Sequence, residues 1–508
     1  MLTTGDALRV NAFKHPDAPC LIDGTRRFSY AQVNRRVNHL ANGLAARGCA
    51  PGDAVAVYAR NSIEYIELFH ACAKLGVRIV TLNFWLRPNE LETLFNHSDA
   101  TWLVVSETTQ QALAHLRPRL TRLRPDGLIV IGRPAVVGAI AFDDLRAADE
   151  AEPGTRVDPQ ASCWMMYTSG TTGSPKGLVR SFLRTTLCLW AGMIEFGYRR
   201  EDVFLAVAPF FHGVTFLPLM VMQAGGSVYV MPEFSPGEVL DVMRAEKISC
   251  GFLVPTMLQM VLNHRGVGDK RYDALRVMVT GGAALPTSVK EAVVRLFGLV
   301  LYEFYGASES GFLTVLRPED QLRKERCCGQ PCFGTEIEIR NPSGSVLPRG
   351  EIGEIFSRCE GRFDGYYKDP GRTAEVLREG WFTAGDLGRM DEEGFVYIVD
   401  RKTDTIITGG ENIYPREIED VLRDHEDVCD CSVIGVPDPL WGEAVLAAVV
   451  LREAATVSAD DLIAFCNARL AGFKRPKRVV FLPELPKNAA GKTLKAMLRQ
   501  QFRPSSGE

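Results

Sequence analysis

The most constraining feature of the sequence is a short stretch rich in glycine and hydroxyl side chains. Residues 167–177 read Tyr-Thr-Ser-Gly-Thr-Thr-Gly-Ser-Pro-Lys-Gly and follow residues 162–166, an apolar run that predicts a buried strand. Glycine lets backbone N–H groups approach anionic oxygens closely, and serine and threonine hydroxyls add donors. The Walker A spacing fails, because Pro175 stands where its second glycine would fall. The stretch predicts a phosphate-binding loop, with an ordinary surface turn as the alternative.

An alternation of predicted strands and helices surrounds this loop. Strands are expected at residues 54–58, 78–82, 102–105 and 128–131, and after the loop at 203–208, 227–231, 248–254 and 276–280. Helices are expected at residues 31–48 and 61–76, the second with Asn61 or Ser62 as its N-terminal cap. The chain has 508 residues, more than one hydrophobic core usually serves, so two or more subdomains are expected. The pattern predicts an α/β fold with largely parallel sheets.

Composition and charge argue against several classes of partner. The net charge of −4 gives no reason to expect nucleic acid or an anionic membrane surface. Thirteen irregularly spaced cysteines, with no secretory leader before them, predict a reducing cytoplasm. The longest apolar stretches, such as residues 214–224, are shorter than the roughly 20 residues that span a bilayer. We therefore expect no integral membrane segment, and the oligomeric state stays open.

Four residues outside the loop stand in contexts that suit nucleotide chemistry. Loops are expected at residues 209–213, 281–283, 305–309 and 383–386. His212 lies in an aromatic run, Glu309 and Asp386 follow glycines in such segments, and Lys492 follows a glycine near the C-terminus. A carboxylate can hold Mg²⁺ or accept ribose hydroxyls, and an ammonium can stabilise charge on a phosphate. A core histidine, two surface acids and a solvated lysine remain the alternatives from the residues alone.

The string at residues 168–177 resembles the phosphate loop of the adenylate-forming superfamily, which comprises acyl- and aryl-CoA ligases, peptide-synthetase adenylation domains and luciferases. The resemblance covers nearly the whole chain, with the motifs in the expected order. It implies a large N-terminal domain, residues 1–400, with two α/β subdomains and a β-rich subdomain. It also implies a small mobile C-terminal α+β domain, residues 401–508. The phosphate contacts it implies are Thr168, Ser169, Gly170, Thr171, Thr172, Gly173 and Lys176.

A second string, Tyr-Gly-Ala-Ser-Glu at residues 305–309, is similar to the Tyr-Gly-x-Thr-Glu motif of this superfamily. Serine replaces threonine here and keeps the hydroxyl. The resemblance implies that Tyr305 stacks on adenine, that Ser308 contacts the α-phosphate and that Glu309 binds Mg²⁺. Gly306 belongs to the same site. Residues 281–283, including Gly282 and Ala283, resemble the backbone platform along the adenine and the acid pocket.

The C-terminal part carries the remaining resemblances. Asp386 and Arg401 correspond to ribose-binding positions, and the hinge is expected at Lys402–Thr403, where relatives often have Asp or Lys at the second position. Gly409 and Gly410 resemble the segment that helps to form the pantetheine tunnel. Lys492 resembles the catalytic lysine of the adenylation step. The C-terminal domain would rotate about the hinge between the two steps.

These resemblances predict an ATP-dependent acid–CoA ligase (an acyl-CoA synthetase) that uses ATP, Mg²⁺ and CoA. The alternatives are a stand-alone adenylation enzyme that loads a carrier protein and a non-catalytic nucleotide-binding protein. The string Gly-Gly-Glu-Asn-Ile-Tyr-Pro at residues 409–415 looks most like the CoA ligases, and filled catalytic positions argue against the non-catalytic alternative.

The acid pocket is expected to be apolar, with His212 near the carboxylate. Neither an arginine, a lysine nor a carboxylate for an amine stands among its predicted residues. Phe304 occupies a position where many relatives have glycine, and it is expected to shorten the pocket. We therefore expect an apolar monocarboxylic acid, aromatic or of short to medium chain. The other predicted lining side chains are Phe210, Phe211, Val214, Phe216, Phe312 and Leu313.

The C-terminal motif generates the first prediction. Lys492→Ala should nearly abolish acyl-adenylate formation, because the ammonium would no longer offset the charge that builds on the phosphate. Thioester formation from a supplied acyl-adenylate should be spared. ATP–pyrophosphate exchange measures the first step, and exchange near the wild-type rate would contradict the assignment.

Overall fold

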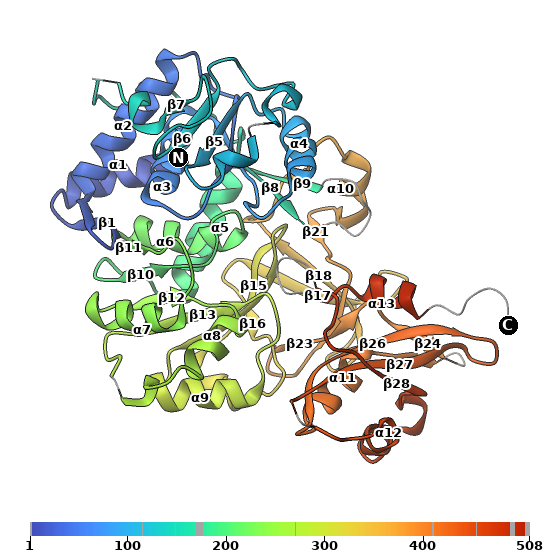
Figure 1. Ribbon diagram of the computed structural model, residues 1–508. Coiled ribbons are helices and arrows are strands. Elements are labelled where there is room, and N and C mark those ends of the chain that lie inside the picture. The colour runs from blue at the N-terminus through green and yellow to red at the C-terminus, as the bar shows by residue number, and fades with distance from the viewer. Residues whose placement is uncertain are drawn as a thin grey trace. The chain divides into compact units, whose positions relative to one another are not determined.

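The strands predicted before the glycine-rich stretch lie together in one sheet of the computed structural model (Figure 1). The structure describes residues 3–113, 115–147, 149–168, 176–269, 271–408, 411–453, 455–487 and 493–502. From β8 to β7 the neighbouring strands are parallel, whereas β9 and β19 are added antiparallel at one edge. The order of this sheet is β19 (Gly365–Tyr366), β9 (Lys176–Ser181), β8 (Ser162–Thr168), β4 (Arg78–Thr81), β3 (Ala54–Tyr58), β5 (Trp102–Ser106), β6 (Leu128–Ile131) and β7 (Ile140–Ala141).

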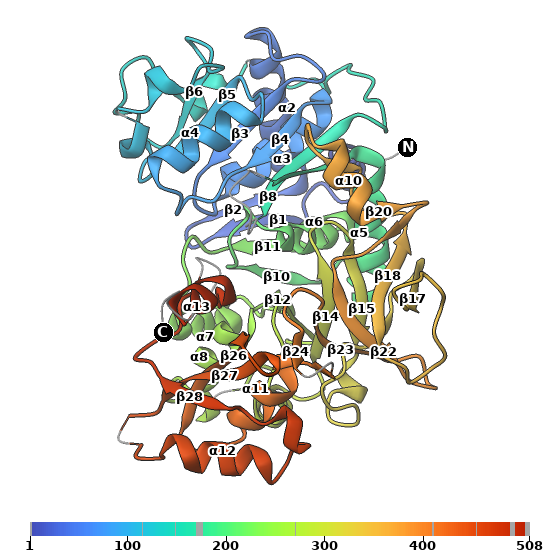
Figure 2. The same cartoon turned by 90° about the vertical axis from the view of Figure 1, so that its right-hand side faces the viewer.

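A second sheet collects the strands that follow the loop, together with two strands from the N-terminus. It is parallel from β14 to β1 and antiparallel at both edges. At one of these edges β14 and β15 lie side by side (Figure 2). The prediction of an α/β fold with largely parallel sheets is confirmed. The strand order of this second sheet is β16 (Gln330–Pro331), β15 (Gly311–Leu316), β14 (Leu301–Ala307), β13 (Val277–Gly281), β12 (Cys250–Phe252), β10 (Val203–Ala206), β11 (Ser227–Val230), β1 (Pro19–Asp23) and β2 (Arg26–Ser29).

Helices separate and cover these two sheets. The helix α3 contacts β4 of the first sheet and β1 of the second, and α5 contacts β8 and β15, so both helices lie between the sheets. The helices of this part are α1 (Thr4–Lys14), α2 (Tyr30–Ala46), α3 (Ile63–Leu75), α4 (Pro88–His97), α5 (Phe182–Phe196), α6 (Phe216–Ala224), α7 (Pro236–Ala245), α8 (Pro255–Leu262), α9 (Thr287–Phe297) and α10 (Pro370–Val376).

The ends of α3 show how local sequence sets these boundaries. Ser62 Oγ accepts a hydrogen bond from the N–H of Tyr65 at 3.2 Å and caps the helix. Gly76 ends it in the left-handed region, with φ of 68°, which glycine adopts without steric cost. Asn61, the other expected cap, turns its side chain to the segment after β10 instead.

The chain divides into two compact units. One comprises Met1–Ile337 with Ser357–Phe382, and the other Glu338–Phe356 with Thr383–Glu508. The strands β17 (Thr335–Arg340) and β18 (Gly353–Cys359) each contribute residues to both units, and β20 (Leu377–Arg378) and β21 (Trp381–Phe382) belong to the first. The hinge at Lys402–Thr403 and the boundary at residue 401 stay predictions.

The second unit contains β22 (Asp386–Met390), which pairs with β23 (Val396–Arg401), and a separate sheet with α11, α12 and α13. That sheet comprises β25 (Glu411–Ile413), β24 (Ile406–Thr408), β27 (Gly442–Leu451), β26 (Val428–Asp438) and β28 (Arg478–Phe481). The helices are α11 (Pro415–Arg423), α12 (Ala459–Asn467) and α13 (Lys495–Gln501). Across the described residues of the whole chain, no helix is both long and apolar enough to cross a membrane.

Candidate nucleotide and acid site

The two strands that flank the predicted phosphate loop form a hairpin. Thr168 at the end of β8 pairs with Lys176 at the start of β9. The predicted contacts Ser169, Gly170, Thr171, Thr172 and Gly173 lie outside the described residues. The strand ends are anchored from other elements. The N–H of Tyr367 donates to Gly177 O at 2.7 Å, and the Tyr167 hydroxyl lies 2.8 Å from His97 Nδ1.

The second predicted motif begins as strand rather than as the expected loop. Tyr305 and Gly306 belong to β14, where antiparallel pairing with β15 satisfies their backbone groups, and the register shifts between them. This register shift is a β-bulge. A Cβ atom at Gly306 would overlap the carbonyl oxygen of Gly311, so the bulge requires glycine at this position. The turn that follows presents Ser308 and Glu309.

Two side chains that the sequence did not indicate hold this turn. Arg180 Nη2 donates to Ser308 O at 2.7 Å and to Glu309 O at 3.3 Å. The Tyr366 hydroxyl donates to Glu309 Oε1 at 2.8 Å. Burial raises the pKa of Tyr366, and the nearby Glu309 carboxylate raises it further, so the phenol keeps its proton. No motif marks Arg180 or Tyr366, and their approach to Glu309 depends on strand pairing between distant segments.

The turn that carries His212 is fixed by three hydrogen bonds from two other segments of the chain. Asn61 Oδ1 accepts from Phe210 N at 2.8 Å, and Asn61 Nδ2 donates to Ala208 O at 2.9 Å. The Thr81 hydroxyl donates to Phe211 O at 3.1 Å. These bonds satisfy buried main-chain groups that belong to no strand. They hold the His212 backbone at one place relative to the sheets.

His212 itself stacks against Phe211, with 4.1 Å between ring centroids. Burial lowers the pKa of His212 to about 4, because an imidazolium would lose its hydration there. The ring is therefore neutral at neutral pH. This turn also adjoins the Ser308 turn, because a Cβ atom at Gly213 would lie 4.0 Å from Ser308 Oγ. Two motifs almost 100 residues apart in the sequence thus meet in the first unit.

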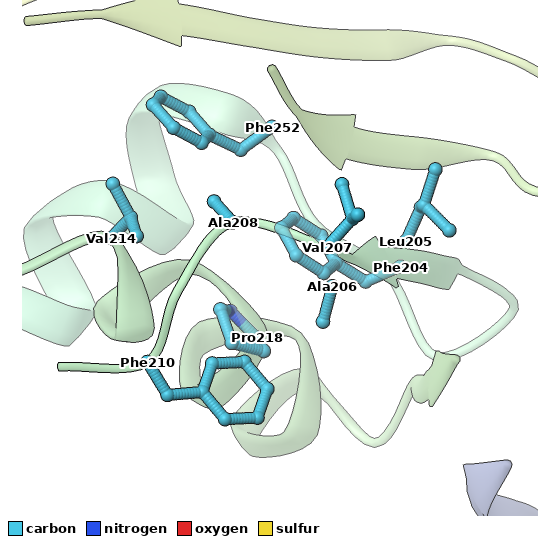
Figure 3. A pocket seen from close by; sticks show the side chains of 9 residues that line it. All are labelled: Phe204, Leu205, Ala206, Val207, Ala208, Phe210, Val214, Pro218 and Phe252. Atoms are coloured by element: carbon cyan, nitrogen blue, oxygen red, sulfur yellow. The ribbon is translucent and has the colours of Figure 1, made fainter. Parts of the chain in front are cut away.

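A small apolar pocket is lined by residues on both sides of His212 in the sequence (Figure 3). In this view Phe252 lies above the pocket, and Phe210 and Pro218 lie below it. Of the predicted acid-binding residues, Phe210 and Val214 line this pocket. The sequence did not indicate the other lining residues, which come mostly from β10 and the two residues after it: Phe204, Leu205, Ala206, Val207, Ala208, Pro218 and Phe252.

Phe304 lies on β14, in the same sheet as β10, and its ring lies near Phe252 of this pocket. Its ring centroid lies 6.2 Å from that of Phe252 and 4.8 Å from that of Phe312. The ring also covers Gly281, where an added Cβ atom would come within 2.7 Å of it. Phe304 is only partly buried, unlike Phe312 and the adjacent Leu313.

Two other predicted wall residues lie in different surroundings. Phe216 is buried against Trp164, at 4.7 Å between ring centroids, and the Arg180 guanidinium lies 5.0 Å from its ring. Phe211 contacts Phe84 as well as His212. Both rings therefore pack beside the pocket rather than line it.

Gly282 and Ala283 have the exposure that a nucleotide platform needs. Both are exposed, and a Cβ atom at Gly282 would meet nothing within 4 Å. Gly282 also has φ of 86°, which explains the glycine. An aromatic base could approach this backbone, and the partly buried Tyr305 offers a ring for stacking. The Glu309 carboxylate is a suitable hard ligand for Mg²⁺. The residues present therefore fit a magnesium nucleotide.

The predicted ribose residues lie in the second unit and pair with each other. Asp386 and Arg401 face one another on β22 and β23, with 3.1 Å between Asp386 Oδ1 and Arg401 Nε. Asp386 begins a strand, whereas a loop was expected. Gly409, Gly410 and Lys492 lie outside the described residues. Lys495, three residues after Lys492, forms an ion pair with Glu419 at 2.8 Å.

Comparison with known families identifies the class of this chain. A family model described as "AMP-binding enzyme" matches residues 8–367, and one described as "AMP-binding enzyme C-terminal domain" matches residues 417–492. The chain belongs to the AMP-binding enzyme family, which confirms the predicted superfamily and enzyme class. The predicted cofactors ATP, Mg²⁺ and CoA agree with this membership.

Named relatives cover almost the whole chain. A feruloyl-CoA synthase of Amycolatopsis sp is 36% identical over 96% of this chain and 96% of its own length. The long-chain-fatty-acid–CoA ligase FadD13 of Mycobacterium tuberculosis is 33% identical over 99% of both chains. A fatty acid–[acyl-carrier-protein] ligase, ScoC of Streptomyces coeruleorubidus, is 32% identical over 97% of this chain and 95% of its own length. These names include both CoA and carrier-protein acceptors.

Solved structures confirm the fold class. The amide bond synthetase McbA from Marinactinospora thermotolerans is 29% identical, with a TM-score of 0.89 over 99% of this chain and 100% of its own. The o-succinylbenzoate CoA synthetase from Bacillus subtilis, solved with its acyl-adenylate intermediate, is 30% identical, with a TM-score of 0.85 over 99% of each chain. The fold thus occurs in enzymes that form acyl-adenylates.

The placement of Glu309 generates the second prediction. Glu309→Gln should raise the Mg²⁺ concentration for half-maximal initial rate by more than about tenfold, since changes around metal ligands alone cost about 10–100-fold. The amide keeps the shape and can still accept from Tyr366, but it offers the cation no charge. A magnesium titration measures the effect, and an unchanged midpoint and rate would remove Glu309 from the site.

Proposed function

We propose that this protein is an ATP- and Mg²⁺-dependent carboxylate–CoA ligase that works through an acyl-adenylate. One observation carries the proposal. The turn that carries His212, predicted to bind the acid, adjoins the turn that carries Ser308, predicted to contact the α-phosphate, and Gly213 lies next to Ser308 Oγ. A carboxylate held beside His212 would lie within reach of an α-phosphate held at Ser308. Because binding already holds the two reactants together, the chemical step no longer costs the translational and rotational entropy of a bimolecular encounter.

The residues suit the two chemical steps. In the first, a carboxylate oxygen attacks the α-phosphorus and pyrophosphate leaves. The carboxylate is already ionised, so it needs no general base, which agrees with a His212 that is neutral and stacked on Phe211. Glu309 would hold the cation, and Lys492 would offset charge on the phosphate. In the second step the CoA thiol sulfur attacks the acyl carbon and AMP leaves.

The remaining nucleotide and CoA contacts are proposed by position. Residues 168–176 would hold the phosphates, and Gly282 with Tyr305 would hold the adenine. Asp386 and Arg401 would bind the ribose hydroxyls. A rotation about Lys402–Thr403 would then exchange Lys492 for the segment at Gly409 and Gly410, as expected where a second substrate needs a different catalytic surface.

We propose an apolar monocarboxylic acid, aromatic or of short to medium chain, as the substrate. The small pocket that Phe210 and Val214 help to line has apolar walls, which favours an apolar acid. Aromatic rings at Phe210, Phe252 and Phe304 surround the same region and would contact a flat ring or a short chain. A feruloyl-CoA synthase among the relatives supports the aromatic alternative.

A carrier-protein thiol is the second candidate acceptor, because one relative is named as a fatty acid–carrier-protein ligase. The two candidate acceptors, CoA and a carrier protein, are distinguished by which thiol leads to release of AMP. With a panel of carboxylic acids, we expect ATP–pyrophosphate exchange for one class of acid and AMP release that depends on CoA. Exchange without CoA-dependent AMP release would favour the carrier protein, and no exchange with any acid would overturn the proposal.

The position of Phe304 generates the third prediction. If its ring shortens the pocket, Phe304→Gly should shift preference toward acids longer by a few carbons, since one methylene in an apolar pocket is worth about 1–3 kcal/mol. Relative kcat/KM over a chain-length series measures the shift.

A purely structural role for Phe304 predicts a different result. Loss of its contacts with Phe252 and Phe312 would leave a cavity that costs about 3–5 kcal/mol of stability. The melting temperature should be measured beside the series. A strongly destabilised variant with an unchanged chain-length profile would contradict the pocket assignment.

A further inference from the structure

A buried arginine stands four residues after Lys176 on the strand that leaves the predicted phosphate loop. Arg180 lies in β9 and has no exposed surface. Transfer of a guanidinium out of water is costly unless other groups replace its hydration. Among the described residues, no carboxylate lies within ion-pair distance of it, and its buried Nε has no hydrogen-bond partner. The charge is therefore held there by something other than an ion pair.

Main-chain carbonyl groups replace the lost hydration. Arg180 Nη2 donates to Ser308 O and Glu309 O, and Nη1 donates to Gly361 O. The guanidinium also lies against the Phe216 ring, which fixes its plane. The rigid fork of donors can bridge two separate segments in a way that a single ammonium cannot. Arg180 thus ties residues 308–309 and residue 361 to β9.

A second contact from the same edge of the sheet reaches the Glu309 side chain. Tyr366 on β19 pairs with Leu178 on β9, and its hydroxyl donates to Glu309 Oε1 at 2.8 Å. The N–H of Phe363 donates to Glu309 O at 2.6 Å. The main chain and the carboxylate of Glu309 are therefore both held by β9 or by the segment paired with it.

We propose that Arg180 is a positioning residue for magnesium–nucleotide binding, and that Tyr366 completes its effect by orienting the Glu309 carboxylate. This inference rests on the proposed function, which assigns Ser308 to the phosphate and Glu309 to the cation. Arg180 touches neither ligand. It fixes the turn that carries Ser308 and Glu309 relative to β9, the strand that leaves the phosphate loop. Nucleotide binding then costs little conformational entropy in this turn.

The experiment measures ATP binding by calorimetry over a series of Mg²⁺ concentrations, with no acid or CoA present. Arg180→Met keeps much of the apolar stem but removes the donors. It should raise the Mg²⁺ midpoint and the Kd for ATP by about 10–100-fold, the range for outer partners of metal ligands. Arg180→Lys should recover part of the loss, because one ammonium can serve only some of the carbonyls. Tyr366→Phe, which loses a single oxygen atom, should raise the Mg²⁺ midpoint alone.

Arg184 provides the matched control. It lies on α5 and bonds to Glu360, the neighbour of Gly361, but makes no contact with the 308–309 turn among the described contacts. Arg184→Met should leave the Mg²⁺ midpoint unchanged. Melting temperatures are recorded for all variants, and Tyr366→Phe keeps the test valid if Arg180→Met does not fold.

The outcomes separate this inference from the proposed function. Wild-type protein that binds no ATP with Mg²⁺ would overturn the proposed function and the inference with it. ATP binding by wild type with unchanged Mg²⁺ midpoints in Arg180→Met and Tyr366→Phe would overturn the positioning role alone. A lowered melting temperature with an unchanged midpoint would reduce Arg180 to a structural residue.

Discussion

The pairing of β8 with β9 is the constraint on which the rest of the candidate site depends. It brings the two ends of the glycine-rich stretch together at Thr168 and Lys176. The same strand, β9, carries Arg180 into the space beside the Ser308 turn and pairs with β19, which carries Tyr366. One antiparallel edge on an otherwise parallel sheet thus links the predicted phosphate loop to the predicted metal ligand through main-chain geometry. Strand pairing is rigid and saturates backbone groups, which suits a site that must hold several anionic oxygens in place.

Burial sets the charge state of the groups around this edge. The Tyr366 phenol remains protonated, because burial and the adjacent Glu309 carboxylate both raise its pKa. His212 remains neutral, because burial lowers its pKa to about 4. Arg180 places a buried guanidinium against the main-chain carbonyl groups of the Ser308 turn. In the proposed reaction, Glu309 would offer its carboxylate to the cation, and Arg180 would stay bonded to the main-chain carbonyl groups around it.

Much of the fold could be predicted from periodicity, but the contacts that shape the site could not. The strand at residues 128–131 and the capped helix that ends at Gly76 follow from local patterns, and both were found. Tyr305 was expected in a loop, because its Gly-containing string resembles a turn, yet pairing with β15 extends the strand through it. Asn61 was expected to cap a helix, and it instead fixes the turn of Phe210. Each difference arises from a partner more than five residues away, which no local pattern encodes.

The second unit adds a constraint that follows from register. Asp386 and Arg401 face each other across β22 and β23, so the two proposed ribose ligands already satisfy one another through a direct ion pair. A ribose that binds there must share both groups, since the carboxylate accepts from hydroxyls and the guanidinium donates to them. Arg401 directly precedes Lys402, whose N–H bonds Gly385 O and whose ammonium pairs with Glu354 at 2.9 Å. In the proposed function, nucleotide binding therefore alters an ion pair immediately beside the proposed hinge. The Asp386–Arg401 ion pair is thus a physical contact that would couple adenylate formation to rotation of the C-terminal domain.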